Sequence, residues 1–232
     1  MIDGGYAYPA GGDVYFRVER SAGYGKLSHR TLKGMQAGAR VEIDDNKEHP
    51  MDFVLWKPST RELPGWDSPW GRGRPGWHVE CSAMIESHLG ETIDIHGGGQ
   101  DLVFPHHENE IAQSTCAHDG ALFCRTWVHN SFVTVDGNKM SKSLGNVKLI
   151  RDLSSDTPGE ALRFALLSSH YRSPLDWTAQ RTTDARRTLT KWYRALRDAP
   201  EVTDVTDSEI DSELMAALCD DLNVAKAIAL SL

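Results

Sequence analysis

Cys81, His106 and Glu110 are side chains of the types that bind a borderline metal ion. A thiolate, an imidazole and a carboxylate suit zinc, and three protein ligands leave one coordination position open. A helix opened by Pro105 would place His106 and Glu110 on one face, four residues apart. Cys81 must then come from a separate element, as is usual in a catalytic zinc site. The spacing alone also fits an ordinary helical His–Glu pair, because His-x-x-x-Glu is common by chance.

A second chemical signal is the string Lys-Met-Ser-Lys-Ser at residues 139–143. Two lysines and two serines on a loop offer point charges and hydroxyl groups to a polyphosphate. Such a loop can stabilise the charge that develops on a leaving pyrophosphate. Taken by itself, a loop with two lysines also fits a solvated basic turn.

A glycine-rich segment follows the strand-like run Thr92–His96 and contains Gly97, Gly98, Gly99 and Asp101. Glycines allow the backbone to approach a ligand closely, and Asp101 can accept hydrogen bonds from a ribose or an amine. The segment lacks the G-x-G-x-x-G spacing, and the sequence has no P-loop pattern. An ordinary tight turn is therefore the simpler interpretation of this segment alone. Trp77 can pack against a small ligand beside the metal, or it can belong to the core.

The elements that must position these residues alternate between helix and strand from residue 75 to about 177. Alternation of this kind favours a parallel α/β sheet. A capping box at residues 157–160, with proline at the first helical position, predicts one further helix start. The remaining expected elements are a helix at 80–88, a strand at 92–96, a helix at 105–118 and a β-rich run at 126–134.

The flanking segments differ from this central part. Residues 1–70 are rich in glycine, proline and charge, and their strand-like runs at 13–18 and 51–56 predict a small α+β insertion. From Thr178 a helix with one apolar face is expected, followed by helices from Ser208 and from about Asn223. The sequence therefore predicts three parts: an insertion at 1–70, a catalytic part at 71–177 and the start of a helical bundle at 178–232.

Composition places the chain among globular proteins. Of its 232 residues, 40% are hydrophobic, which is enough to bury a core, and no apolar run of eighteen residues predicts a membrane span. The N-terminus lacks the pattern of a signal peptide, so a cytoplasmic location is expected. The four cysteines form no Cys-x-x-Cys pair and predict no disulfides. Cys116, Cys124 and Cys219 are expected to be small buried hydrophobic residues.

The net charge of −8 is concentrated at one end of the chain. From Glu201 onward there are eight acidic residues and one basic residue, Lys226, whereas the first 200 residues hold 25 acidic and 24 basic residues. This acidity argues against general binding of polyanions, but it leaves room for a local groove that binds nucleic acid.

Three strings in the sequence resemble cysteinyl-tRNA synthetases, a family of class I aminoacyl-tRNA synthetases. They are Gly73 to Met84, Asp94 to Glu110 and the KMSKS string Lys139 to Ser143, and the similarity extends over essentially the whole chain. The resemblance implies an α/β fold with a Rossmann-type catalytic domain, present here in part. It also implies an enzyme that uses ATP, with Mg²⁺, to activate cysteine and to load it onto tRNA(Cys).

The resemblance assigns roles to individual residues. Cys81, His106 and Glu110 match three zinc ligands, so that zinc would bind the substrate thiolate and discriminate against serine. The KMSKS lysines Lys139 and Lys142 are the expected catalytic residues, and Lys142 matches the lysine that contacts ATP. Two further groups match binding positions: Trp77 and His96 match residues of the cysteine pocket, and Gly97, Gly98, Gly99 and Asp101 match the region that holds the adenosine.

The sequence also departs from the family pattern. The His-x-Gly-His motif of class I synthetases is absent, and so is the further cysteine ligand expected upstream of Cys81. We therefore expect a fragment that lacks the N-terminal half and the C-terminal tRNA-binding region, is inactive alone and tends to self-associate through an exposed sheet edge. Two alternatives are a ligase that joins cysteine to an amino sugar and a non-catalytic zinc-binding module derived from a synthetase.

Overall fold

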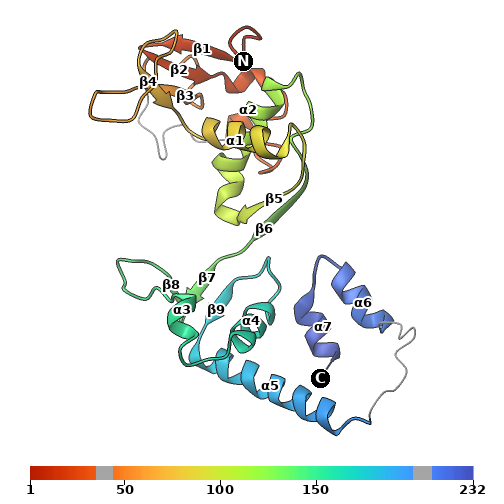
Figure 1. The fold of residues 1–232 in the computed structure, drawn as a ribbon. Coiled ribbons are helices and arrows are strands. Elements are labelled where there is room, and N and C mark those ends of the chain that lie inside the picture. The colour runs from red at the N-terminus through yellow and green to blue at the C-terminus, as the bar shows by residue number, and fades with distance from the viewer. Residues whose placement is uncertain (35–43, 201–210, 232) are drawn as a thin grey trace. The chain divides into compact units, whose positions relative to one another are not determined.

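The computed structural model describes residues 1–34, 44–200 and 211–231 (Figure 1). The chain divides into two compact units, Met1–Val128 and His129–Leu232, and strand β6 (Cys124–Asn130) continues from the first unit into the second. The predicted division into 1–70, 71–177 and 178–232 stays a prediction. The helix start expected at Ser208 lies outside the described residues.

The first unit begins with an antiparallel sheet of four strands in the order β1-β2-β3-β4. Its strands are β1 (Ala7–Ala10), β2 (Asp13–Phe16), β3 (Phe53–Pro58) and β4 (Gly73–Pro75). The rings of Phe16 and Phe53 stack with their centroids 4.9 Å apart, and the core of the sheet includes Ala112 of a helix that follows later in the chain. The two strand-like runs predicted in this region are confirmed as β2 and β3.

The rest of the first unit is made of two helices and a strand pair. Helices α1 (Val79–Leu89) and α2 (Glu108–Ala117) supply Ile85 and Ile111 to a small core. Strands β5 (Ile93–Gly99) and β6 form a two-stranded sheet that contributes Ile93 and Phe123, the latter from just before β6, to the same core. Helix α1 confirms the helix predicted at 80–88, and Gly90 ends it with a φ of 91°.

The glycine segment after residue 96 is extended, so the expected tight turn is wrong. Strand β5 continues through Gly97 and Gly98 to Gly99. Neighbouring atoms lie close to the positions that Cβ atoms would occupy on Gly97 and Gly98. A Cβ on Gly97 would lie 3.0 Å from the carbonyl oxygen of Val128, and one on Gly98 would lie 2.9 Å from Leu102 Cδ1. Glycine is used here for close packing of the backbone rather than for chain reversal.

The second unit contains a three-stranded sheet in the order β8-β7-β9. Strand β7 (Val133–Val135) pairs antiparallel with β8 (Asn138–Lys139) and parallel with β9 (Leu175–Trp177). The same unit contains three helices: α3 (Ile150–Leu153), α4 (Gly159–Leu167) and α5 (Ala179–Asp198). The predicted capping box at the start of α4 is wrong: Pro158, with a ψ of 136°, precedes the helix, and no side chain caps it.

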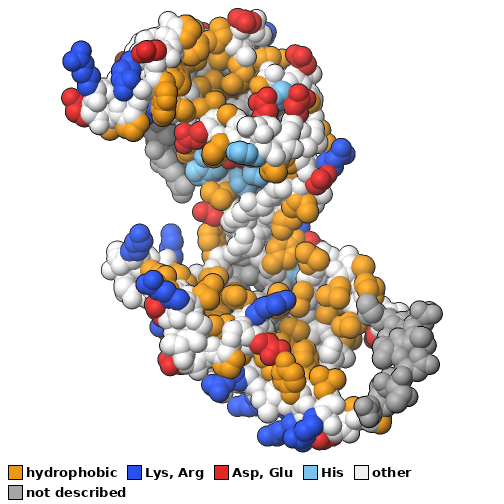
Figure 2. All heavy atoms as spheres, in the orientation of Figure 1, with side chains coloured by type: hydrophobic (Ala, Val, Ile, Leu, Met, Phe, Trp, Pro, Cys, Tyr) orange, Lys and Arg blue, Asp and Glu red, His pale blue; other side chains and the backbone are white. Residues whose placement is uncertain are grey.

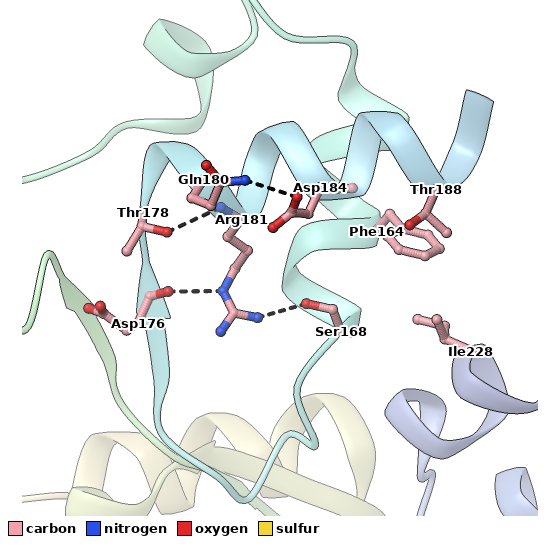
Figure 3. A pocket seen from close by; sticks show the side chains of 10 residues that line it. Phe164, Ser168, Asp176, Thr178, Gln180, Arg181, Asp184, Thr188 and Ile228 are labelled. Atoms are coloured by element: carbon pink, nitrogen blue, oxygen red, sulfur yellow. Dashed lines mark hydrogen bonds between the residues drawn. The ribbon is translucent and has the colours of Figure 1, made fainter. Parts of the chain in front are cut away.

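Helix α5 is fixed to the sheet and to α4 through Arg181 (Figure 3). Its side chain donates hydrogen bonds to the Asp176 carbonyl oxygen (2.9 Å) and to Ser168 Oγ (2.7 Å). Thr178 caps the helix by accepting a 3.1 Å bond from the Arg181 backbone N–H, so the predicted start of this helix is confirmed. These residues line a cavity of about 470 Å³, which Ile228 also lines.

The last two helices are α6 (Ser212–Cys219) and α7 (Val224–Leu230). Between them Asp221 accepts hydrogen bonds from Tyr171 Oη (2.6 Å) and from Arg172 Nε (2.5 Å), which ties the helix pair to the loop before β9. Cys219 is exposed at the end of α6, so its expected burial is wrong, whereas Cys124 is buried as predicted. Within the described residues, no helix is both long and apolar enough to cross a membrane.

Candidate functional site

Two of the predicted metal ligands come together in the first unit. Donor atoms of Cys81, Glu110 and a third residue, His78, all lie within 4.8 Å of one another. Cys81 is on α1 and Glu110 on α2, as expected for ligands from separate elements. Figure 2 shows several histidine side chains gathered on this part of the unit. The sulfur, nitrogen and oxygen donors form a set that fits zinc.

His106, the third predicted ligand, is in direct contact with His78. Its Nδ1 is 2.9 Å from His78 Nε2, and the two rings meet edge to face. Val103–His107 are irregular, because Phe104, with a φ of −140° and a ψ of 133°, kinks the chain just before Pro105, and the regular helix α2 starts at Glu108. The backbone from Pro105 to His107 leads into α2 without a further kink, so His106 and Glu110 lie four residues apart at the start of this helix, as predicted. The zinc set Cys81, His106 and Glu110 stays a prediction.

The backbone and one buried amide position the donors on α1. His78 immediately precedes α1 with a φ of 65°, a left-handed conformation that non-glycine residues adopt at a cost, most often at functional sites. Gln113, which is 1% exposed, accepts a 2.7 Å bond from Ser82 Oγ and donates a 2.8 Å bond to the Trp77 carbonyl oxygen. This amide fixes the start of α1 against α2 and so holds Cys81 near Glu110.

Buried polar side chains at the start of α2 join it to the loop after β2. Glu108 accepts hydrogen bonds from the backbone N–H (3.0 Å) and the Oγ (2.9 Å) of Ser28. Asn109 accepts a 2.6 Å bond from Tyr24 Oη. Glu108 and Asn109 are each 1% exposed, so these bonds satisfy Glu108 Oε2 and Asn109 Oδ1, whereas Glu108 Oε1 is buried without a hydrogen-bond partner among the described residues. The helix that carries Glu110 is thereby fixed at its first turn.

Burial sets the protonation of the donors. Burial raises the pKa of the Cys81 thiol, and the negative charges of Glu110 and Glu80 raise it further. Burial also lowers the pKa of His78, which favours the neutral imidazole that binds metals. The site without an ion therefore holds a thiol and a neutral imidazole, and a bound cation would favour the thiolate.

The residues expected to line a cysteine pocket lie beside these donors. Trp77 is 41% exposed, stacks on His78 and meets the His106 ring edge to face. His96, on β5, has its Nε2 2.9 Å from Glu110 Oε2. Both residues thus border the metal donors, and their role in binding cysteine stays a prediction.

The residues expected to bind adenosine lie at the end of β5 and in the turn that follows it. Gly97, Gly98 and Gly99 end β5, and Asp101 lies exposed in the short 3₁₀ turn Gln100–Leu102 that follows. The missing Cβ of Gly98 leaves space for the ring of His107, since a Cβ there would lie 3.1 Å from His107 Cε1. The binding of adenosine by this region stays a prediction.

The KMSKS string lies in the second unit as an exposed loop. Lys139 ends β8, and both Lys139 and Lys142 are exposed. Asn146 holds the loop closed: it donates a 3.1 Å bond to the Lys139 carbonyl oxygen and accepts a 2.9 Å bond from the Ser141 backbone N–H. The loop has the fixed base and the exposed ammonium groups that binding of a polyphosphate requires.

Comparison with known proteins decides the family. Residues 1–187 match the family described as tRNA synthetases class I (C) catalytic domain. The chain belongs to this family. Its α/β fold, with parallel and antiparallel pairing, agrees with the predicted fold class of a class I synthetase catalytic domain.

Relatives of this class I synthetase chain carry the name Cysteine–tRNA ligase. The protein of Parvibaculum lavamentivorans is 58% identical over 230 residues, which are 99% of this chain and 49% of that protein. Those of Maricaulis maris and Rhodospirillum rubrum are 57% and 56% identical over 229 residues, 99% of this chain and 50% of each protein. The chain spans about half the length of these curated relatives.

One solved structure also resembles the chain. A ternary complex of LeuRS, tRNA and LeuAMS from Agrobacterium radiobacter K84 covers 72% of this chain and 28% of its own, with 18% identity and a TM-score of 0.48. This likeness adds nothing to the class I synthetase assignment.

Sequence reasoning missed three residues of this class I synthetase site. His78 precedes Cys81 by three residues, and the His-x-x-Cys spacing at a helix start was a usable signal for it. No signal in the sequence indicated Gln113, because a glutamine side chain in a helix is usually exposed to solvent. His107 was hidden by its neighbour His106, since only the local helix geometry decides which of two adjacent histidines is buried.

Proposed function

We propose that this chain is the part of an ATP-dependent cysteine–tRNA ligase that recognises cysteine and carries the KMSKS loop. The observation that carries the proposal is the cluster of Cys81, His78 and Glu110 donors, in a chain whose relatives are named Cysteine–tRNA ligase. Because the chain spans half of those relatives, the remainder of such a protein is its proposed structural complement.

The donor set fits zinc. Cys81 and Glu110 offer a thiolate and a carboxylate, and His78 offers an imidazole. His106, whose ring contacts that of His78, offers a second imidazole. Glu110 Oε1, which lies 3.7 Å from His78 Nδ1, is the carboxylate oxygen on the side of Cys81, and a buried carboxylate beside a thiol and an imidazole is suited to ligate a zinc ion. A zinc ion held by these residues would coordinate the cysteine thiolate and disfavour serine, whose hydroxyl is a poorer ligand.

The chain's own residues would then orient the substrate. Trp77 is half-exposed beside the donors and can cover one side of a small amino acid. The buried amide of Gln113 would keep α1 and α2 in register while substrate enters. These groups favour one amino acid in one orientation, which converts substrate binding into positioning for reaction.

The KMSKS loop would act on the nucleotide. In the proposed reaction, the carboxylate of cysteine attacks the α-phosphorus of ATP and pyrophosphate leaves. Lys139 and Lys142 would stabilise the charge that develops on the pyrophosphate, with Mg²⁺ accompanying the nucleotide. The cysteinyl group would then pass to the 3′ hydroxyl of tRNA(Cys), with release of AMP. A cytoplasmic location stays a prediction.

A chimeric enzyme tests the proposal. The matching segment of the Maricaulis maris relative would be replaced by this chain, and ATP–pyrophosphate exchange would be measured with cysteine and with serine. We expect exchange that depends on cysteine, and charging of tRNA(Cys). A folded, zinc-loaded chimera without exchange would instead identify a non-catalytic zinc module. Transfer of cysteine to an amino sugar but not to tRNA would identify the second alternative.

A further inference from the structure

A second group of donors lies next to the Cys81 cluster and shares one residue with it. Donor atoms of His96, His107 and Glu110 all lie within 4.8 Å of one another. His107 and Glu110 are 4% and 5% exposed, and His96 is half-buried on β5. Neither His96 nor His107 belongs to the zinc set that the sequence predicts.

The contact between His96 and Glu110 points to a missing ligand. His96 Nε2 and Glu110 Oε2 are 2.9 Å apart, within ion-pair distance, yet neither atom makes a hydrogen bond in the described parts of the chain. Both atoms are buried. Unsatisfied buried polar atoms are costly, and a cation coordinated by both atoms would satisfy them together.

The surroundings of this group are those of an enclosed site. The ring centroid of Trp127 lies 4.9 Å from that of His96 and 5.3 Å from that of His107. The ring centroids of Phe123 and His96 lie 5.8 Å apart. Gly98, which has no Cβ, leaves the space that the His107 ring occupies. An apolar shell of this kind limits access of water and strengthens the binding of an ion.

The two oxygens of Glu110 face different donors. Oε1 is 3.7 Å from His78 Nδ1, in the Cys81 cluster, and Oε2 is 2.9 Å from His96 Nε2. A carboxylate in this position can bridge two neighbouring ions, as in two-metal sites. Imidazole and carboxylate donors select zinc, cobalt or nickel over magnesium and calcium.

We propose that His96, His107 and Glu110 form a binding position of their own for a divalent transition metal, beside the Cys81 position. Binding here is weaker than at Cys81, because the shared Glu110 carboxylate is the only negative ligand. The proposal concerns metal binding alone and does not rest on the ligase reaction. Its chemical consequence is a second positive charge at the edge of the expected cysteine pocket.

Cobalt titration of variants in the full chain tests this proposal. In Cys81→Ala the thiolate is gone, so we expect one equivalent of Co²⁺ to bind with visible absorption bands and no sulfur-to-cobalt charge-transfer band. Adding His96→Asn or His107→Asn should weaken that binding by at least about tenfold. The matched control is Cys81→Ala with His88→Asn, which removes an exposed histidine of α1 that belongs to neither donor group and should leave Co²⁺ binding unchanged.

Two results would overturn the proposal. The first is a Cys81→Ala variant with an unaltered circular dichroism spectrum that binds no Co²⁺. The second is Co²⁺ binding that survives His96→Asn and is lost with His106→Asn. Failure here would leave the proposed function standing, because the charge-transfer band of the unmodified chain reports separately on the Cys81 position.

Discussion

Cys81 is the residue on which the predicted metal chemistry depends most directly. It is the one thiol within reach of Glu110 and His78 in the donor clusters of the described residues. We predict that Cys81→Ser lowers zinc affinity by more than the roughly 10–100-fold that loss of an outer partner costs. Competition with a chromophoric chelator measures this. Cys219→Ser is the control, because Cys219 is exposed on α6, and an equal loss there would contradict the assignment.

Lys142 is a residue whose role can be separated from the metal. In the chimera, Lys142→Ala is expected to lower the rate of ATP–pyrophosphate exchange by about 10²–10³-fold, the usual effect of removing one group that stabilises developing charge. Zinc affinity should not change, because all donors lie in the other unit. Lys148→Ala, at an exposed lysine six residues later, is the control and should exchange normally.

At the scale of elements, local sequence signals predicted the helices well and the glycine segment badly. Helices were expected from Thr178 and from about Asn223, and both side chains cap the helices that begin there, because a side-chain oxygen at this position satisfies backbone donors whatever surrounds it. The extended conformation at Gly97 and Gly98 depends on Val128 and Leu102, which are distant or downstream in the sequence. Contacts of that kind are set by the packed fold and leave no local pattern.

The connection between α2 and the loop at Ser28 should stabilise the first unit. We predict that Glu108→Ala lowers the free energy of unfolding by about 1–3 kcal/mol, because the partly buried N–H and hydroxyl of Ser28 lose the Glu108 carboxylate as acceptor. Urea denaturation measures the change. Glu86→Ala, which removes a partly exposed pair with His118, is the control, with an expected change of about 0–1 kcal/mol. Equal losses of unfolding free energy in the two variants would contradict a stabilising role for the hydrogen bonds of Glu108.

The helix pair α6–α7 should respond to acid through Asp221. Hydrogen bonds from Arg172 and Tyr171 lower the pKa of Asp221 to about 2, from an ordinary 3.8. A carboxyl with a lowered pKa stabilises the fold above pH 3.8, and this stabilisation is lost as the pH falls through 2.

Asp221→Asn should therefore unfold at a lower temperature than the unmodified chain near neutral pH, with the difference vanishing toward pH 2. Thermal unfolding measured across this pH range checks the prediction. Asp220→Asn, at the exposed neighbour, is the control and should show a constant difference.

At the scale of the whole molecule, the separation into two units predicts a local response to metal. All candidate donors lie in Met1–Val128. Zinc at about 100 times its dissociation constant stabilises the state that binds it by about 2.7 kcal/mol. Hydrogen exchange should therefore slow in residues 44–128 and stay unchanged in 129–200. Equal protection of both ranges would contradict independent units.

The sequence predicted some of the side chains that lie together in the candidate site, and only part of their geometry. Cys81 and Glu110 were predicted and do come together, since each lies on a helix that the local pattern supports. His106 precedes Glu110 by four residues as expected, but its ring also contacts His78, a donor that the sequence did not predict. The contact between the His106 and His78 rings depends on how the segments around α1 and α2 pack together, which no local sequence pattern shows.

The left-handed backbone of His78 has a consequence for protein engineering. A non-glycine residue in that conformation costs about 1–2 kcal/mol, more than the roughly 0.5–1 kcal/mol that glycine loses in chain entropy. In His78→Gly the relief of backbone strain therefore offsets part of what is lost with the contacts of the His78 ring to Trp77 and His106, while an imidazole donor is removed. A screen for thermostability alone would underrate the damage to the metal site, so variants of this chain need selection for metal binding and stability together.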